Sequence, residues 1–451
     1  MKTILILGAG LSSNMLIRYF TELSNTMKIR IRVGDRNIET ASAKTKNCSR
    51  CSAFEFDVYN ERQRNREITK ADIVVSMLPA RMHPLVATTC IRHRKNMVTA
   101  SYASSDIRAL DGIARKKGVL IMNECGVDPG IDHMSAMQMI DRIRSGGDEL
   151  IAFESSTGGL VAPGFENNPW QYKFTWNPRN VVLAGQDGAR FLHNGKFKYI
   201  PYHKLFNRNE TIQVPGLGEF EVYGNRDSLK YRETYGLHNL ETMFRGTIRR
   251  PGFCEAWDTF VQLGATDDSY VMEDTENMTY REFINSFMAY RVDISVEEKL
   301  SLYLGIPLNS AMMGRLHWLG IFDDRKIGVP GLTPAKVLQQ ILEEKWSLES
   351  GDKDMIVMQH QFDYLDGPLR KKIYATMSYI GKDPYNTAMA ATVGLPVAMV
   401  ARMILEGRIN LQGVQLPIVK EIYEPVLKEL ETYGIKFIEE EVVIPRHISS
   451  V

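Results

Sequence analysis

The sequence has little of what marks secreted, membrane-spanning or nucleic-acid-binding proteins. Its five cysteines among 451 residues are an odd, sparse set that predicts no disulfide framework and indicates a reducing compartment. No run approaches the roughly 20 apolar residues that span a bilayer. Its 55 basic and 54 acidic side chains nearly cancel, so no surface for nucleic acid or lipid is predicted. We therefore expect a cytoplasmic protein without nucleic-acid or membrane partners.

One C-x-x-C spacing occurs, at Cys48 and Cys51. A zinc site needs a second pair of ligands, and neither another such pair nor a nearby histidine accompanies these cysteines. The surrounding segment is polar and loop-like. We interpret the spacing as incidental and predict no metal site.

Short apolar runs alternate with helix-like polar segments over residues 1–125, which is the pattern of β-α-β units. At 451 residues the chain exceeds the size of a single core, so two or three domains are expected. We predict an α/β fold whose first domain is a Rossmann-type, doubly wound parallel sheet with ligands at the carboxyl ends of its strands. Strands are expected at 3–7, 29–34, 53–56, 73–77, 97–100 and 119–123, with helices such as 13–23 and 84–94 between them.

After residue 125 the character of the sequence changes. Residues 126–275 are rich in glycine, proline and aromatic side chains, and they predict a loop-rich, antiparallel α+β domain for substrate binding and dimerisation, which 351–385 complete. Residues 276–350 predict a small helical subdomain. Residues 386–451 are expected to return to the Rossmann domain, so that the chain crosses between domains twice.

Several later elements can be placed from their own signals. Thr333 followed by Pro334 predicts the start of a helix, because threonine caps helices and proline suits the first turn. The remaining expectations are strands at 355–358 and 372–379 and helices at 388–405 and about 423–433.

A glycine-rich turn follows the first predicted strand and opens the first predicted helix, as dinucleotide binding requires. Gly8 permits the tight turn, and Gly10 lets the backbone approach a pyrophosphate that the helix amides then bind. The third fingerprint position is Ser13, which is small enough to keep helix and strand close. We predict that Gly8, Gly10, Leu11, Ser12 and Ser13 bind the cofactor.

The second predicted strand ends in Asp35 and Arg36. An acidic side chain here accepts hydrogen bonds from the adenosine ribose of NAD, whereas an arginine can pair with the 2′-phosphate of NADP. Local chemistry leans to NAD, but both cofactors stay open. Other cofactor contacts are expected after the third to sixth strands, at Asp57, Val58, Ser76, Met77, Leu78, Ala100, Ser101 and Val127.

The segment after the sixth strand, residues 123–133, is charged and rich in turns, and it lies at the edge of the sheet where ligands bind. Asp128 is its main catalytic candidate, although an aspartate before a proline can instead cap the following helix. Glu124 and Asp132 are further candidates, and His133 is expected to be a structural side chain inside that helix.

Motifs spread through the chain resemble the saccharopine reductase family, the glutamate-forming saccharopine dehydrogenases. Among them are V-T-x-S-Y at 98–102, D-P-G-I-D-H at 128–133, G-G-L-x-A-P at 158–163 and N-P-x-x-Y-K-F-x-W at 168–176. N-R-D-S at 225–228, R-G-T-I-R at 245–249 and T-V-G-L-P at 392–396 also match, in order along nearly the whole chain.

The resemblance implies an NAD(P)-dependent oxidoreductase that condenses α-aminoadipate semialdehyde with glutamate, reduces the imine and so forms saccharopine in lysine metabolism. It implies Asp128 and Tyr102 as catalytic residues and a homodimer. Saccharopine carries three carboxylates, so its site needs several cations. The expected substrate contacts are Ser101, Tyr102, Asp128, Lys173, Arg226, Gly246, Thr247 and Arg249, and Arg179 is a further cationic candidate.

The fungal reductases that the chain resembles carry a cysteine where it has Thr157, so a thiol role there is not transferable. A rival is an enzyme of the carboxynorspermidine dehydrogenase type, whose partner is a diamine. Such a substrate would favour acidic residues, whereas the run from Arg245 to Arg250 favours extra carboxylates. A third reading is a cofactor-binding regulator without catalysis, since a fold does not fix a function.

Overall fold

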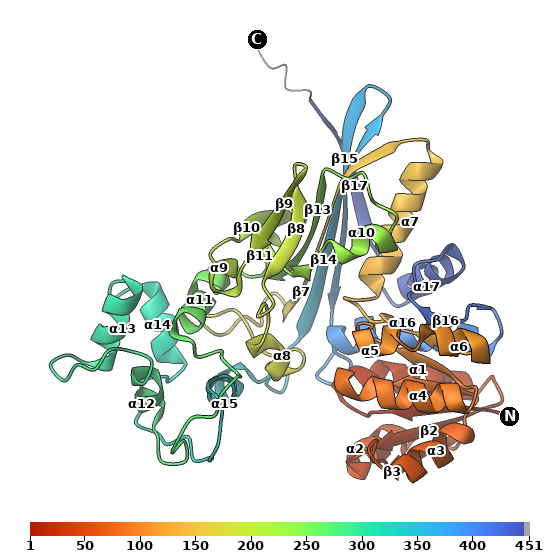
Figure 1. Cartoon of the computed structure of the whole chain (residues 1–451), viewed down its shortest axis with the longest axis horizontal. Helices are drawn as coiled ribbons and strands as arrows, with labels where there is room; N and C mark the ends of the chain where they lie inside the picture. The colour runs from red at the N-terminus through yellow and green to blue at the C-terminus, as the bar shows by residue number, and fades with distance from the viewer. Residues whose placement is uncertain (446–451) are drawn as a thin grey trace. The chain divides into compact units, whose positions relative to one another are not determined.

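The computed structural model describes residues 1–445, which form two compact units. Unit 1 comprises Met1–Glu149 and Met377–Ile438, and unit 2 comprises Leu150–Thr376 with the residues from Glu439 onward (Figure 1). The chain therefore passes between the units three times rather than twice. Unit 1 reaches past the predicted boundary at 125 because it includes the helix after the sixth strand, and the last strand lies in unit 2 rather than with the Rossmann domain. The predicted helical subdomain, 276–350, lies within unit 2.

Unit 1 is built on a parallel seven-stranded sheet in the order β16-β6-β5-β4-β1-β2-β3. This confirms the predicted doubly wound arrangement, whose usual order is 3-2-1-4-5-6, with β16 added at one edge. Its central strands are buried on both faces, which accounts for their continuous apolar sequence. The strands are β1 (Lys2–Leu7), β2 (Ile29–Asp35), β3 (Cys51–Glu55), β4 (Ile73–Ser76), β5 (Asn96–Thr99), β6 (Leu120–Met122) and β16 (Gly413–Gln415).

Helices flank this sheet (Figure 1). Short 3-10 turns, η1 (Leu11–Ser13) and η2 (Ala80–Met82), precede α1 and α4. The helices of unit 1 are α1 (Asn14–Ser24), α2 (Ile38–Thr45), α3 (Glu61–Thr69), α4 (His83–Arg92), α5 (Ser105–Arg108), α6 (Asp111–Lys117), α7 (Ile131–Ser145), α16 (Ala388–Leu405) and α17 (Lys420–Thr432).

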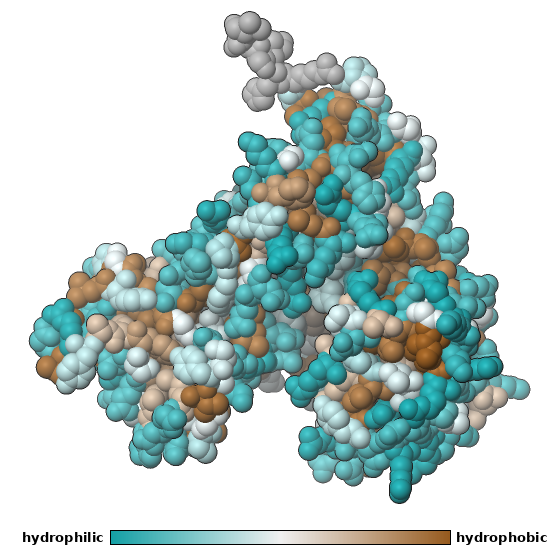
Figure 2. Space-filling view, viewed as in Figure 1, coloured by the Kyte–Doolittle hydropathy of each residue, from teal (hydrophilic) through white to brown (hydrophobic). Residues whose placement is uncertain are grey.

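Helix α16 packs on α1 beside the glycine-rich turn. Gly394 makes the approach close, because a Cβ at this position would lie 2.9 Å from the carbonyl oxygen of Ser12. Within residues 1–445, α16 is the one helix long and apolar enough to cross a membrane, but it is 83% buried. Burial explains its apolar sequence as that of a core helix, and the visible surface is mainly hydrophilic (Figure 2).

Unit 2 contains a mixed ten-stranded sheet whose main path is β10-β11-β13-β7-β14-β15-β17. The predicted antiparallel pairing holds for β10, β11 and β13, but β13 and β7 run parallel, so the prediction was wrong at the centre of the sheet. The strands are β7 (Glu149–Val161), β8 (Ala189–His193), β9 (Lys196–Ile200), β10 (Glu210–Val214), β11 (Gly218–Gly224), β12 (Arg226–Asp227), β13 (Thr242–Arg249), β14 (Asp354–Asp366), β15 (Leu369–Ile380) and β17 (Ile438–Ile444).

An aromatic core holds the helices of unit 2. Trp170, Trp257 and Trp346 are each at most 2% exposed and pack against one another. Thr333 caps α15 as predicted, since its hydroxyl accepts a hydrogen bond from the Lys336 amide. The helices are α8 (Pro178–Val182), α9 (Tyr202–Leu205), α10 (Lys230–Thr234), α11 (Phe253–Leu263), α12 (Tyr280–Asn285), α13 (Val296–Leu304), α14 (Ala311–Trp318) and α15 (Pro334–Trp346).

Cys48 and Cys51 are joined by a disulfide, which corrects the expectation that their spacing is incidental. The turn between α2 and β3 brings their Cα atoms to 5.2 Å, within the usual range for a bridge. The polar sequence gave no sign of this turn. Cys90, Cys125 and Cys254 are free and buried.

Candidate active site

The glycine-rich turn of unit 1 fits a dinucleotide. Gly8 has a φ of +100° and lies so close to β4 that a Cβ would sit 2.7 Å from the Met77 carbonyl oxygen. A Cβ at Gly10 would meet nothing within 4 Å, so this side of the turn is open to a ligand. The Ser13 hydroxyl is turned inward and donates to the Gly10 carbonyl oxygen at 2.7 Å. Leu11 is exposed, as a residue on the open side of the turn should be.

Asp35 ends β2 next to this turn. Its Oδ2 accepts a hydrogen bond from the Ala9 amide at 2.6 Å, and its Oδ1 accepts one from the Asn37 amide at 2.8 Å. Arg36 is exposed. Lys44 of α2, which sequence reasoning missed, also reaches the turn and donates to the carbonyl oxygens of Ala9 and Gly10.

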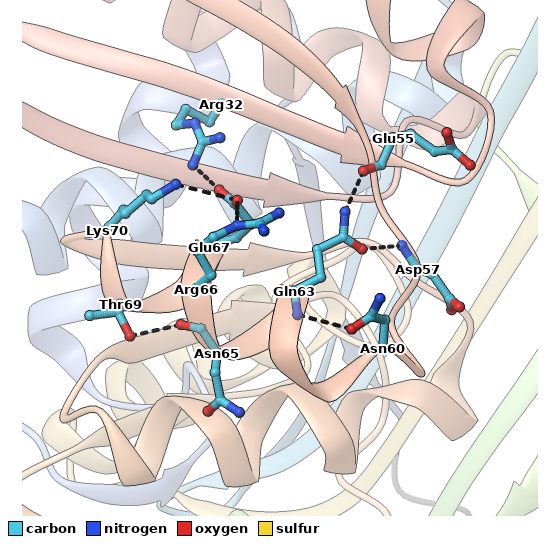
Figure 3. Close-up of polar contacts among 10 residues, drawn as sticks. All are labelled: Arg32, Glu55, Asp57, Asn60, Gln63, Asn65, Arg66, Glu67, Thr69 and Lys70. Carbon is cyan, nitrogen blue, oxygen red and sulfur yellow. Dashed lines mark hydrogen bonds and ion pairs between the residues drawn. The ribbon is translucent and has the colours of Figure 1, made fainter.

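The residues after β3 are held by Gln63 of α3. Its side-chain amide donates to the Glu55 carbonyl oxygen at 2.7 Å and accepts from the Asp57 amide at 2.9 Å (Figure 3). Asp57 is exposed. Val58 is 5% exposed and packs in the core of the unit, and its carbonyl oxygen accepts a hydrogen bond from Arg64.

The same figure shows Glu67, a buried carboxylate that ties α3 to β2. It pairs with Arg32 of β2 and with Arg66 at 2.8 Å (Figure 3). Burial opposes its ionisation, but the hydrogen bonds from these two arginines lower the pKa of Glu67 below its ordinary value. The charge on Glu67 therefore stabilises the scaffold and takes no part in the chemistry.

His83 organises the strand ends beside the expected nicotinamide position, and sequence reasoning missed it. Its Nδ1 lies 2.9 Å from Ser76 Oγ, and its Nε2 lies 2.8 Å from Ser101 Oγ and 3.2 Å from Thr99 Oγ1. Burial lowers the pKa of His83 to about 4, so the ring is neutral at pH 7. Ser76 is fully buried, and its hydroxyl belongs to this network. The other residues predicted at this edge are Met77, Leu78 and Ala100, which are half-buried, and Val127, which is buried.

Tyr102 and Asp128 meet at the carboxyl edge of the sheet. The Tyr102 hydroxyl donates to Asp128 Oδ1 at 2.9 Å, and both side chains are half-buried. Asp128 does not cap α7, whose N-cap is Gly130 without a side-chain hydrogen bond. The turn needs glycine at 130, because a Cβ there would lie 2.1 Å from the Gly126 carbonyl oxygen. The structure therefore places Asp128 beside Tyr102, and the N-cap position of α7 belongs to Gly130.

The buried side chains of Glu124 and His133 form a pair that supports the turn carrying Asp128. His133 Nε2 lies 2.7 Å from Glu124 Oε2, and the Ala103 amide donates to Glu124 Oε1 at 3.0 Å. Burial opposes ionisation of Glu124, but these hydrogen bonds lower its pKa below the ordinary value. Asp132 accepts a hydrogen bond from the Gly130 amide at 2.5 Å. Glu124, Asp132 and His133 are therefore engaged in holding the segments that carry Tyr102 and Asp128.

Two of the cations predicted in unit 2 are paired within the unit. Lys173 is 2% exposed, and its Nζ donates to Asp352 Oδ2 at 2.6 Å. Arg179 pairs with Asp268. Their charges are balanced by carboxylates of the same unit, so the structure favours a structural role for both over substrate binding.

Arg249 has a different setting. Its guanidinium lies against Tyr172, Tyr223 and Phe253, with its carbon 5.3, 5.7 and 5.2 Å from the ring centroids. It donates to the Ile248 carbonyl oxygen at 2.9 Å, but its Nε has no hydrogen-bond partner among the described residues. A buried cation without a paired carboxylate in this part of the chain is suited to a substrate carboxylate.

The strands beside Arg249 carry further candidates. Thr247 of β13 pairs with Thr157 of β7 and with Tyr223 of β11. The Thr157 hydroxyl is buried and unpartnered within residues 1–445, which makes it a candidate ligand contact. Gly246 has no space for a side chain, because a Cβ would lie 2.2 Å from Val222. Arg226 is exposed on β12, with a φ of +53°.

Two family models match the chain. Residues 4–122 match the saccharopine dehydrogenase NADP binding domain, and residues 126–435 match the saccharopine dehydrogenase C-terminal domain. Among similar proteins is saccharopine dehydrogenase [NADP(+), L-glutamate-forming] of Pyricularia oryzae, which is 32% identical over 447 residues, covering 96% of this chain and 98% of the relative. The mitochondrial alpha-aminoadipic semialdehyde synthase of Bos taurus is 33% identical over 97% of this chain, which spans 47% of that longer protein.

Two solved structures are also similar to this chain. Apo saccharopine dehydrogenase (L-Glu forming) of Saccharomyces cerevisiae superposes with a TM-score of 0.87 and 31% identity, over 98% of this chain and all of the yeast chain. A homospermidine synthase of Legionella pneumophila in complex with NAD has a TM-score of 0.57 at 10% identity, over 98% of this chain and 91% of that one. The second similarity concerns the fold alone.

Proposed function

Because the chain belongs to the saccharopine dehydrogenase family, we propose that it catalyses the reversible condensation of α-aminoadipate semialdehyde with L-glutamate to give saccharopine. It is an NAD(P)-dependent oxidoreductase of that family, and the proposed reaction acts on a CH–NH group. The observation that carries the proposal is the hydrogen bond from Tyr102 to Asp128 at the ligand-binding edge of a dinucleotide-binding sheet. We include a cytoplasmic location and a homodimer in the proposal.

The nicotinamide, when bound, accepts or returns the hydride. The remaining chemistry is movement of protons, since the amine must lose a proton before it attacks the aldehyde and the carbinolamine oxygen must gain one before water leaves. A carboxylate hydrogen-bonded to a phenol can accept and return a proton at one position. Asp128 is therefore the general acid and base of the proposal, and Tyr102 orients it.

Substrate recognition requires cations, since saccharopine carries three carboxylates. In unit 2, Arg249 is a buried guanidinium held in an aromatic box, and its Nε has no hydrogen-bond partner within residues 1–445. Arg226 is exposed and belongs to the N-R-D-S motif at 225–228. Arg249 suits carboxylate binding better than Lys173 and Arg179, which carboxylates of the same unit already neutralise. A dicarboxylate amine such as glutamate matches this arrangement, and a diamine does not.

The test is a comparison of substrates on the purified chain. Saccharopine and carboxynorspermidine are each oxidised with NAD and with NADP while the absorbance of the reduced nicotinamide is followed. Turnover of saccharopine with release of glutamate supports the proposal. Oxidation of carboxynorspermidine alone would replace it with the rival substrate, and cofactor binding without turnover of either would point to a regulator.

A further inference from the structure

The adenosine end of the cofactor site carries a specificity feature that departs from the NADP(+) named for its relatives. We propose that this chain prefers NAD to NADP, because Asp35 is fixed where a 2′-phosphate would have to lie. The inference rests on the proposed function only in requiring that the Rossmann unit binds a nicotinamide dinucleotide. It concerns the ribose rather than the amine substrate.

Asp35 is held in place from two sides. The Ala9 amide of the glycine-rich turn donates to Oδ2 at 2.6 Å, and the Asn37 amide beyond the strand donates to Oδ1 at 2.8 Å. A carboxylate fixed at both oxygens cannot swing away from a bound nucleotide. It accepts hydrogen bonds from ribose hydroxyls, whereas it repels a phosphate at the same position.

Lys44 is a cation close enough to Asp35 to interact with it electrostatically, but it is already engaged. Its Nζ lies 2.6 Å from the Ala9 carbonyl oxygen, 2.5 Å from that of Gly10 and 3.2 Å from Ser13 Oγ. An ammonium group has three hydrogens, and these three acceptors use all of them. Burial, partly offset by Asp35, lowers the pKa of Lys44 to about 8, which also reduces its value as a phosphate ligand. Lys44 therefore stabilises the turn and is not available to a 2′-phosphate.

The start of α2 is also closed to an anion. The Asn37 side-chain oxygen accepts hydrogen bonds from the amides of Glu39 at 2.9 Å and Thr40 at 3.2 Å, so these helix amides are occupied. Glu39 adds a carboxylate in the first turn. Arg36 is left as the cation of this segment that can pair with a phosphate, but the neighbouring carboxylates of Asp35 and Glu39 oppose that attraction.

The test measures binding rather than catalysis. ADP-ribose and 2′-phospho-ADP-ribose are titrated into the full chain by calorimetry, and the ratio of their dissociation constants is the readout. We expect ADP-ribose to bind about 100-fold more tightly to the natural protein. The Asp35→Asn variant, which keeps an oxygen acceptor but loses the charge, should reduce that ratio by at least about tenfold, mainly by tighter binding of the phosphorylated ligand.

Asp72→Asn is the matched control. Asp72 accepts a backbone hydrogen bond from Thr3 at 2.6 Å, but it lies at the amino ends of the strands, so its variant should leave the ratio unchanged. The Asp35→Ser variant repeats the test with a smaller side chain if the amide folds poorly. Equal or tighter binding of 2′-phospho-ADP-ribose to the natural protein would overturn the preference while leaving the proposed reaction intact. If the natural protein binds ADP-ribose more tightly but does not oxidise saccharopine, the proposed reaction fails and the preference for NAD stands.

Discussion

The phenolic oxygen of Tyr102 lies 2.9 Å from Oδ1 of Asp128 and donates a hydrogen bond to it. The two residues come from different segments, one following β5 and the other following β6. Adjacent parallel strands bring their carboxyl ends to one edge of the sheet, so residues 26 positions apart meet there. Glu124 fixes both segments, because it accepts from the Ala103 amide on one and from His133 on the other.

Tyr102→Phe tests the role of that hydrogen bond. The variant keeps the aromatic ring but removes the hydroxyl that donates to Asp128. The Asp128 carboxylate is then less well oriented for proton transfer. We expect kcat for saccharopine oxidation to fall by about 100-fold with a smaller change in KM. Steady-state kinetics over a range of pH checks this, and unchanged kcat would show that Tyr102 does not orient the general acid and base.

His83→Gln should alter how stability depends on pH. The folded-state pKa of His83 is lowered from 6.5 to about 4, so only the unfolded chain takes up this proton between those values. Stability from the neutral ring is present above about pH 6.5 and is lost as the pH falls toward 4, by about 3 kcal/mol.

The thermal midpoint, followed from pH 7 to pH 4, checks the prediction. The difference in thermal midpoint between the natural protein and His83→Gln should become smaller as the pH falls. His203→Gln, at an exposed histidine, is the control and should run parallel to the natural protein. If the thermal midpoint of His83→Gln also ran parallel to that of the natural protein, the ring of His83 would not be held neutral by burial.

A double-mutant cycle on Glu124 and His133 tests whether this buried pair stabilises the segments that carry Tyr102 and Asp128. Glu124→Gln and His133→Gln should each lower stability, because removing one member of a buried pair leaves the other without its partner. We expect a coupling free energy above about 1.5 kcal/mol from unfolding measurements on the two single variants and the double variant. Additive effects would mean that the 2.7 Å contact contributes nothing specific.

Lys173→Met and Arg249→Met compare a cation proposed to stabilise the fold, Lys173, with one proposed to bind the substrate, Arg249. Lys173 is paired with Asp352, so its loss strands a buried carboxylate and should cost about 3 kcal/mol of stability. Arg249 forms no ion pair within residues 1–445, so its loss should change stability less but raise the KM for saccharopine at least about tenfold. Thermal unfolding and kinetics on both variants check the contrast, and a reversed pattern would refute the assignment.

Much of the fold could be predicted because strands buried on both faces and apolar helices have continuous patterns. β1, α1 and α16 were predicted to within about a residue at each end, and the parallel order followed from the alternation of elements. The strand predicted at 355–358 extends to Asp366 in the structure, because Gln359, His360 and Asp363 are polar yet buried in the sheet. The last strand, β17, is mostly exposed and has no alternating apolar pattern.

The site was harder to predict than the fold, because its geometry depends on partners distant in the sequence. Asp128 was predicted from the turn after the sixth strand, and Tyr102 from the family resemblance. His83 was missed, since its hydroxyl partners come from two other strands, although a histidine beside the proline that starts α4 is a visible signal. Lys44 was missed because nothing local shows that a helix lysine reaches a turn 34 residues away.

Oxidation of saccharopine by the natural chain and by Asp128→Asn is the decisive test of the proposed reaction. Reduced nicotinamide is followed by absorbance and glutamate by mass spectrometry, with NAD and NADP in parallel and Asp72→Asn as a folded control. We expect glutamate release by the natural protein and the control, and a loss of about 100-fold or more in kcat for Asp128→Asn. Full activity in Asp128→Asn, or no turnover of saccharopine by the natural chain with either cofactor, would contradict it.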